Sequence, residues 1–302
     1  MDRRGFLKST LGFGAGLFTA QLAIPGSAKC KMISPATDLI ARNYFDDIIK
    51  HKISQFKKEN LNLKIGETHC HSTFSDGTSS VGDIINRASR LGLDYLILTE
   101  HLIPDKYPLE LTLASINERW RCVHEWNSTL FNPVEVCPAF EVSTTDGHLI
   151  LVLDSYYLQT NTFREIRNQF SRFNFEMGSM EEAAKLVNPF GGITIIPHPE
   201  RERGYPFGVS TSFIKDNLLG LVDAIEDIST GHGYEENYSG ELGLASIGSS
   251  DDHFNLIIGT TVTAYDSNLN KNFIEAVRAK ETRAVKIDDS LREFISAARL
   301  II

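Results

Sequence analysis

Residues 63–77 read LKIGETHCHSTFSDG and combine a predicted strand with a loop of potential metal ligands. The short apolar run at 63–70 predicts a buried strand. His69 and His71 end that strand two residues apart, so both imidazoles project from one face and can reach the same ion. Asp76 follows in the loop, where its carboxylate could bind a neighbouring ion. The stretch therefore predicts a strand whose carboxyl end holds metal ligands.

Short apolar runs and helical patterns alternate along the rest of the chain. The strands lack polar alternation, which is typical of sheets covered on both faces. Seven or eight strand–helix units predict an α/β fold with a closed, TIM-like barrel, and no G-x-G-x-x-G follows the first strand as a dinucleotide-binding sheet would require. Strands are predicted at 63–70, 95–99, 134–142, 149–153, 193–196, 221–228, 244–248 and 284–287, and helices at 81–91, 109–130, 179–187, 212–219, 268–280 and 290–300.

The first 28 residues have the layout of an export signal. Arg3 and Arg4 lie in a charged start, and residues 9–28 form an uncharged run, rich in Gly and Ala, that ends in small residues. The paired arginines followed by Gly-Phe-Leu-Lys resemble a twin-arginine signal, so we expect a periplasmic protein with no stable membrane span after signal removal. A membrane anchor is the alternative, although the run is marginal for spanning a bilayer.

Two further units are predicted after that signal. Residues 29–60 have apolar positions at helical spacing and predict a helical arm on the outside of the domain. Residues 61–302 contain no long linker or internal repeat and predict one barrel domain.

Composition and charge narrow the classes of function. The 302 residues contain 30 Lys and Arg against 39 Asp and Glu, a formal net charge of -9. This acidic balance argues against nucleic acid as a partner, since nucleic-acid binding needs a basic surface. Four cysteines are too few for a disulfide-built scaffold, and Cys122 and Cys137 could either pair or remain buried thiols.

Histidines and carboxylates recur at or beside the predicted strands. The carboxyl ends of barrel strands form one rim, where active sites lie. Clusters of His and carboxylate residues there indicate a metal or catalytic site. The residues concerned are His69, His71, Asp76, Glu100, His101, Glu141, His148, His198, Asp251 and His253.

Five motifs in chain order resemble those of the PHP family, named for polymerase and histidinol phosphatase domains. They are His69-x-His71 with Ser75-Asp76-Gly77, Thr99-Glu100-His101, Glu141, His198-Pro199 and Asp251-x-His253. The family usually has Asp at the position of Glu100 and Ala at that of Asp252. The stretch Ile258-Gly259-Thr260-Thr261, together with the export signal, is most similar to the carbaryl-hydrolase-like branch.

The resemblance implies a distorted (β/α)7 barrel with two or three divalent ions (Zn, Mn or Fe) at the carboxyl rim of its strands. It implies one ion held by His69, His71, Glu141 and Asp251. A second would share Glu141 and take His198, with His148 as a further candidate ligand or, alternatively, a structural histidine. A third would be held by Asp76, His101 and His253.

The implied activity is that of a metal-dependent phosphoesterase acting on small phosphate esters. A hydroxide bridging two ions would attack phosphorus, with Glu141, Asp251 and His198 as the central catalytic ligands. Two alternatives stay open. One is a carboxylic or carbamate ester hydrolase that uses the same ions, and the other is a metal-binding barrel without turnover.

Two further residues are candidates for substrate binding. Arg201 follows the His198 motif and could bind a phosphate through two of its guanidinium nitrogens. The alternating glutamates around it also fit an ion-paired surface loop. His232 lies between two glycines in another predicted rim loop, which could be a lid or a plain surface loop.

Overall fold

The computed structural model describes residues 35–103, 105–126, 132–159, 163–173, 178–201 and 208–288. The predicted export signal and the predicted helix at 290–300 lie outside these residues. Within them, no helix is both long and apolar enough to cross a bilayer.

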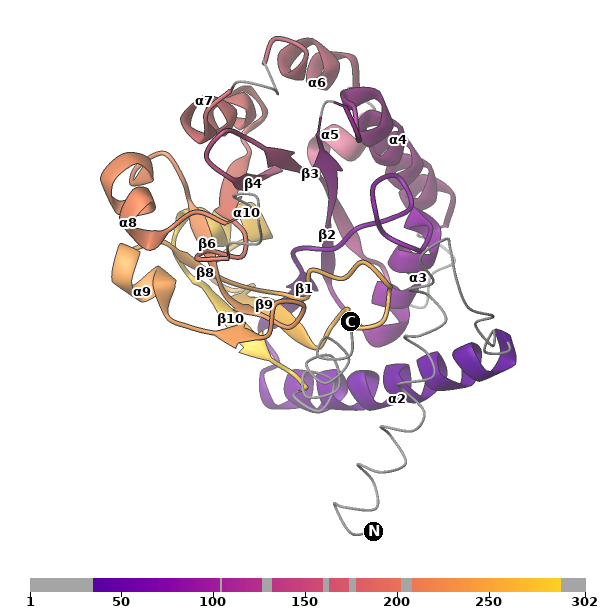
Figure 1. Ribbon diagram of the computed structural model, residues 1–302. Helices are drawn as coiled ribbons and strands as arrows, with labels where there is room; N and C mark the ends of the chain where they lie inside the picture. Colours follow the sequence, from indigo (N-terminus) through magenta and orange to yellow (C-terminus); the bar gives the residue numbers. More distant parts are fainter. Residues whose placement is uncertain are drawn as a thin grey trace, which may run out of the picture.

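One curled, mixed β-sheet forms the centre of the molecule, with helices outside it (Figure 1). Its strand order is β10-β9-β1-β2-β3-β4-β5-β6-β7, and β8 pairs with β6. The curl brings β8 against β9 and β10 from the far end of that order. The strands are β1 (Leu63–Glu67), β2 (Tyr95–Leu102), β3 (Glu135–Ser143), β4 (His148–Val152), β5 (Ile193–Ile196), β6 (Ala224–Ser229), β7 (Tyr234–Glu235), β8 (Ala245–Ser249), β9 (Thr261–Asp266) and β10 (Thr282–Lys286).

This architecture confirms the predicted α/β, barrel-like fold as a curled half-barrel, because the strand order runs from β10 to β7 without closing on itself within the described residues. The alternation of strand and helix is also less regular than predicted. Pairs β1–β2, β2–β3, β5–β6 and β6–β8 are parallel. By contrast, β4 joins β3 through a tight turn and runs antiparallel to both β3 and β5. β9, which the sequence did not predict as a strand, runs antiparallel to β1 and β10. The sheet is therefore a distorted barrel wall of mixed strands.

The helices begin and end where their local sequence dictates. Ser80 caps α3 by accepting from Asp83 N, and Gly92 ends it in the left-handed conformation with φ 85°. The predicted capping box at Ser179 and Glu182 forms. The helical segments are α2 (Pro35–Glu59), α3 (Val81–Leu91), α4 (Leu109–Trp126), α5 (Tyr156–Gln159), α6 (Phe163–Phe170), α7 (Met180–Ala184), the 3₁₀ turn Lys185–Phe190, α8 (Thr211–Phe213), the π turn Ile214–Leu218, α9 (Tyr238–Leu242) and α10 (Phe273–Arg278).

Two apolar clusters hold these layers together. The larger lies between the sheet and the outer helices and includes Ile49 and Ile53 of α2, both almost fully buried. The smaller joins the sheet to α10, which packs against β5, β8 and β9. Cys122 and Cys137 are buried free thiols, so the disulfide alternative does not apply to this pair.

Candidate metal centre

The predicted ligands gather at one rim of the sheet although they come from six strands and their loops. Most of these residues lie at or just beyond the carboxyl ends of their strands, which are β1, β2, β3, β5 and β8. β4 runs the opposite way and contributes its first residue, His148, to the same rim. All nine predicted metal-binding residues take part in the contacts below: His69, His71, Asp76, His101, Glu141, His148, His198, Asp251 and His253.

The centre of the site is formed by two imidazoles and two carboxylates. His69 Nε2 lies 3.4 Å from Glu141 Oε2 and 3.3 Å from Asp251 Oδ1. His71 Nε2 lies at the same two distances from those oxygens, 3.4 and 3.3 Å. Tetrahedral zinc with bonds of about 2.05 Å separates its ligands by about 3.3–3.4 Å. Four of the six distances among these atoms therefore match the spacing of tetrahedral ligands.

A second group of ligands lies around Asp76. His101 Nε2 is 3.4 Å from Asp76 Oδ2, and His253 Nε2 is 3.2 Å from Asp76 Oδ1. His71 joins this group, since its Nδ1 lies 3.9 Å from Asp76 Oδ1. The structure thus brings together the three residues expected to hold a separate ion.

Glu141 links the centre to a third group. While its Oε2 faces His69 and His71, its Oε1 lies 2.8 Å from His148 Nδ1 and 3.0 Å from His198 Nε2. A carboxylate in this position can join two ions, one on each oxygen. His148 therefore lies inside the site.

The buried atoms of the site match a set of metal ligands. Most buried polar atoms in proteins have hydrogen-bond partners. Here several converging atoms have none, and a divalent cation would satisfy them. Mixed imidazole and carboxylate sets suit zinc, manganese and iron. The atoms without a hydrogen-bond partner include His69 Nε2, both ring nitrogens of His71, His101 Nδ1, His198 Nδ1, His232 Nε2, Glu141 Oε2 and Asp251 Oδ1.

The charges of the site keep both central carboxylates ionised. Burial alone would raise the pKa of Glu141, but His101, His148 and His69 outweigh it and hold that pKa well below its usual range. The pKa of Asp251 is likewise held low, because His69 and His253 outweigh the effect of burial. Ionised carboxylates are the form that binds cations.

The surroundings of the site shift the pKa values of its histidines in opposite directions. Burial, with His253 and His101 nearby, lowers the pKa of His71 to about 4. For His101 burial is outweighed, chiefly by Glu141 and Asp76, and the pKa rises to about 10. For His253 the carboxylates of Asp251 and Asp76 outweigh burial and raise the pKa to about 9. The pKa of His69 is likewise held well above its ordinary value, because Asp251, Glu141 and Glu226 outweigh burial. Without metal, protons on His69, His101 and His253 therefore offset the charge of the carboxylates at neutral pH.

Glu226 is a buried residue of the site that the sequence did not reveal. Its Oε1 lies 2.8 Å from His69 Nδ1, and its Oε2 accepts the backbone N–H of His198 at 2.8 Å. Ser249 Oγ and Tyr234 OH also donate to it. A carboxylate behind a metal-binding imidazole fixes the orientation and basicity of that ligand. Because Glu226 lies within β6 and away from the quoted motifs, no pattern in the sequence marked it.

The two residues that depart from the family pattern, Glu100 and Asp252, both accept hydrogen bonds from neighbouring loops. Glu100 accepts the hydroxyls of Ser72 and Ser75, which start the loop that leads to Asp76. Asp252 accepts backbone N–H groups of four residues in the turn after β8: Phe254, Leu256, Ile257 and Ile258. Both residues therefore shape the loops that present the ligands.

Two ligands stand on strained backbone. His198 has φ 30° and Asp251 has φ 48°, a left-handed region in which residues other than glycine are uncommon. Such conformations cost about 1–3 kcal/mol each and cluster at functional sites. The strain at two ligands of one cluster supports a functional role.

The two predicted substrate-binding residues lie on the same side of the centre. His232 Nε2 is 2.7 Å from Asp251 Oδ2, so this side chain reaches the ligand cluster. The Arg201 guanidinium lies over the ring of Tyr234, 4.5 Å from its centroid. The Glu200 carboxylate accepts a hydrogen bond from the Thr211 hydroxyl and forms no ion pair with Arg201 among the described residues. Residues 202–207, which include the other alternating charges of this loop, lie outside the described residues.

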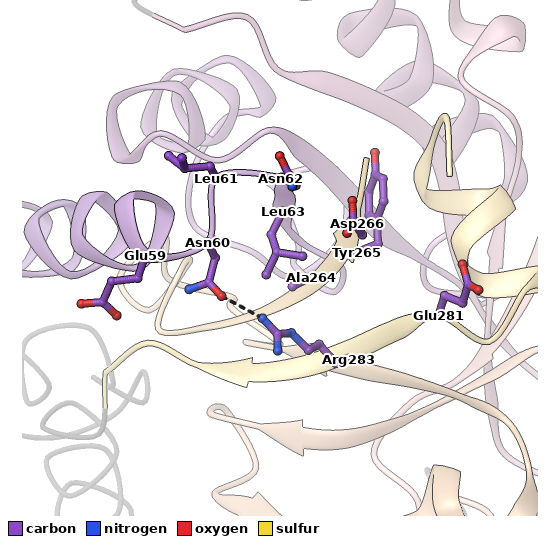
Figure 2. Close-up of a pocket in the computed structure, with 10 residues that line it drawn as sticks. All are labelled: Glu59, Asn60, Leu61, Asn62, Leu63, Ala264, Tyr265, Asp266, Glu281 and Arg283. Carbon is purple, nitrogen blue, oxygen red and sulfur yellow. Dashed lines mark hydrogen bonds between the residues drawn. The ribbon is translucent and has the colours of Figure 1, made fainter. Parts of the chain in front are cut away.

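The pocket in Figure 2 is separate from this cluster. It has a volume of about 450 Å³ and lies where β1 begins, β9 ends and β10 begins, at the opposite end of the barrel from the histidines. Arg283 there donates to Asn60, beside Glu59 and Glu281. This pocket contains none of the predicted ligands.

Fold and site together define the class: an α/β protein with a curled mixed sheet and buried His/Glu clusters suited to metal ions at one rim. No family model matches the sequence, and no curated protein matches it. A solved structure from Bacteroides vulgatus, a two-domain protein described as containing a PHP-like metal-dependent phosphoesterase, is similar at 19% identity with TM-score 0.53. The match covers 74% of this chain and 65% of that one, so this chain spans about two thirds of the similar protein's length.

Two further structures resemble the chain more distantly. PsfC from Pseudomonas syringae has 15% identity and TM-score 0.48, over 80% of this chain and 98% of its own. A candidate metal-dependent phosphoesterase from Bifidobacterium adolescentis has 14% identity and TM-score 0.42, over 63% of this chain and 87% of its own. At these identities the similarity concerns the fold alone, and of these three structures the Bacteroides vulgatus protein supports it.

Proposed function

We propose that this protein is a metal-dependent hydrolase that cleaves small phosphate esters. The observation that supports the proposal most is the position of Glu141, whose two oxygens face two different sets of histidines. That arrangement is suited to a pair of ions joined by one carboxylate, which is a geometry that promotes in-line displacement. The fold shared with the Bacteroides vulgatus protein is consistent with this proposal.

The residues of the site would divide the work as follows. Bound divalent cations would supply a water of lowered pKa and positive charge for the phosphoryl oxygens. Glu141 and Asp251, both held ionised, would keep the cations in place. His69 would be oriented by Glu226 at its Nδ1, which leaves Nε2 directed to the centre. Arg201 is the proposed contact for a further negative group of the substrate.

The alternative substrates use the same residues. A carboxylic or carbamate ester would need the same activated water but no positive group for phosphoryl oxygens. The comparisons do not support the carbaryl-hydrolase-like branch, which stays a prediction from residues 258–261.

The test combines metal analysis with three substrates. Full-length protein prepared without chelators is analysed for metal and assayed on p-nitrophenyl phosphate, bis-p-nitrophenyl phosphate and p-nitrophenyl acetate. We expect two or three ions per chain and phosphoester turnover. His69→Ala should lose both, whereas His51→Ala, an exposed histidine of α2, should change neither.

Other outcomes separate the alternatives. Bound metal with cleavage of the acetate alone would favour the carboxylic or carbamate ester hydrolase. Bound metal without any turnover would favour a barrel that only binds metal. A protein without stoichiometric metal would contradict all three hypotheses, because each of them requires bound ions.

We also propose export through the twin-arginine route, on the basis of Arg3, Arg4 and the uncharged run at 9–28. Replacing both arginines by Lys should keep the protein in the cytoplasm of a bacterial host, as measured by cell fractionation. Unchanged export of that variant would contradict this route.

A further inference from the structure

His232 lies beside the metal centre at a position that none of the ligand groups above uses. It follows β6, and its Nε2 lies 2.7 Å from Asp251 Oδ2. Asp251 presents its other oxygen, Oδ1, to His69 and His71. The two oxygens of Asp251 therefore face two different groups of nitrogen atoms.

The contact between His232 and Asp251 lacks the geometry of a hydrogen bond. His232 Nε2 is a buried atom without a hydrogen-bond partner, although a carboxylate oxygen lies within hydrogen-bond distance. The ring nitrogen and the carboxylate oxygen are therefore close without a well-aligned hydrogen bond between them. His69 Nε2 and Asp251 Oδ1 have the same pattern at the central position. A divalent cation shared by two such atoms would satisfy both of them.

The backbone holds His232 in this place. Gly231 N donates to Ser250 O at 2.8 Å, and Gly233 N donates to Ser229 O at 2.8 Å, which closes the turn. A Cβ at position 231 would lie 2.3 Å from Ser250 O, so only glycine permits this close approach. His232 also packs beside His198, with ring centroids 4.8 Å apart. The loop that carries His232 is therefore packed against the ligand cluster.

We propose that His232 is a metal ligand, and that it binds a divalent cation together with Asp251 Oδ2 on the side of the centre where His198 packs. Asp251 would then join two cations, as Glu141 does. The inference rests on the metal centre of the proposed function and is independent of the substrate.

The spacing of the two atoms indicates which cation fits. With bonds of about 2.1 Å, two ligand atoms 2.7 Å apart subtend about 80° at the ion, close to the right angle of a six-coordinate site. Tetrahedral zinc would need a wider separation. The pair therefore suits Mn²⁺ or a similar ion that completes its coordination with water.

The experiment measures Mn²⁺ binding to full-length protein stripped of metal, with free Mn²⁺ followed by electron paramagnetic resonance. We expect His232→Ala to lose one bound ion, or to bind one ion at least tenfold more weakly, while the remaining ions bind as in the wild type. The control is His124→Ala, an exposed histidine of α4 whose Nδ1 donates to Trp120 O in its own helix. If His232→Ala does not fold, judged by circular dichroism, His232→Leu takes its place.

Equal stoichiometry and equal affinities in wild type and variant would overturn the proposal. Wild-type binding by His232→Leu would also overturn it, because a leucine side chain fills space but supplies no ligand atom. Failure of phosphoester turnover alone would contradict the proposed function and leave this inference standing. A wild-type protein that binds no Mn²⁺ would contradict the metal centre and the inference together.

Discussion

The side chains around His69 show how single residues of this site depend on partners that are remote in the sequence. His69 belongs to β1 and its loop, whereas Glu226, which contacts its Nδ1, lies 157 residues away on β6. The spacing of His69 and His71 indicated that both reach one ion. The partner that orients His69 could not be identified, because the contact exists only after the sheet has curled.

Glu226→Gln should weaken metal binding by about 10- to 100-fold, the usual effect of removing the carboxylate behind a metal-binding histidine. Gln keeps the shape of the side chain but loses the negative charge next to His69 Nδ1. Zinc affinity, measured by competition with a coloured chelator, would report the change. Glu241→Gln on the exposed surface of α9 is the matched control. Unchanged affinity in Glu226→Gln would show that Glu226 does not act on the metal through His69.

Metal binding should release about three protons per chain at pH 7.5, because ligands must lose their protons to bind. His101 and His253, with pKa values of about 10 and about 9, carry two of these protons in the metal-free chain. His69 carries the third, because Asp251, Glu141 and Glu226 outweigh burial and hold its pKa well above its ordinary value. His71, with a pKa of about 4, is already neutral and releases none. Calorimetry in HEPES and in Tris would give the number from the difference in apparent enthalpy.

The sign of this effect follows from the direction of the pKa shifts. Folded-state values above the ordinary 6.5 mean that protonated His101 and His253 stabilise the metal-free fold below pH 6.5, and that this contribution disappears as the pH rises through about 9–10. Metal affinity should therefore rise with pH across the same interval. His253→Ala should release about one proton fewer, and identical enthalpies in both buffers would refute the assignment.

At the scale of elements, local sequence signals placed most helices and strands. Ser80 and Gly92 bound α3 where the pattern predicted it, because capping is an interaction within one turn of chain. β9 was not predicted although it joins β1 to β10. Its role comes from pairing with strands on both sides, which local propensity does not report.

Gly92→Ala should lower the free energy of unfolding by about 1 kcal/mol, because alanine is unfavourable in the left-handed conformation that ends α3. The added Cβ meets only Ile53 Cγ2 at 3.9 Å, so the cost is conformational and not a clash. Urea denaturation of full-length protein would measure it. Equal stability of the variant and the wild type would mean that α3 can end in another conformation.

At the scale of the whole molecule, α2 is the element whose position only the structure shows in detail. The sequence predicted a helical arm on the outside of the domain. In the structure α2 lies along the barrel (Figure 1), with Ile49 and Ile53 against Gly259 and α3. Arg87 of α3 pairs with Asp46 of α2 at 2.8 Å.

Ile49→Ala should therefore destabilise the protein by about 2–4 kcal/mol, as expected for a cavity made in a packed core. His51→Ala, on the exposed side of the same helix, should change the stability by less than about 0.5 kcal/mol. Thermal unfolding of the two variants, followed by circular dichroism, compares them directly. Similar melting temperatures for both would mean that α2 contributes little to the fold.

The sequence by itself determined the α/β class, both ends of α3, the start of α7 and the residues that meet at the rim. These follow from periodicity, capping and the recurrence of His and carboxylates at strand ends, all of which act over a few neighbouring residues. The tertiary structure alone decided the mixed strand directions, the contact of Glu226 with His69 and the approach of His232 to Asp251. These depend on how the sheet curls, since that curl brings together atoms that no local pattern in the chain relates.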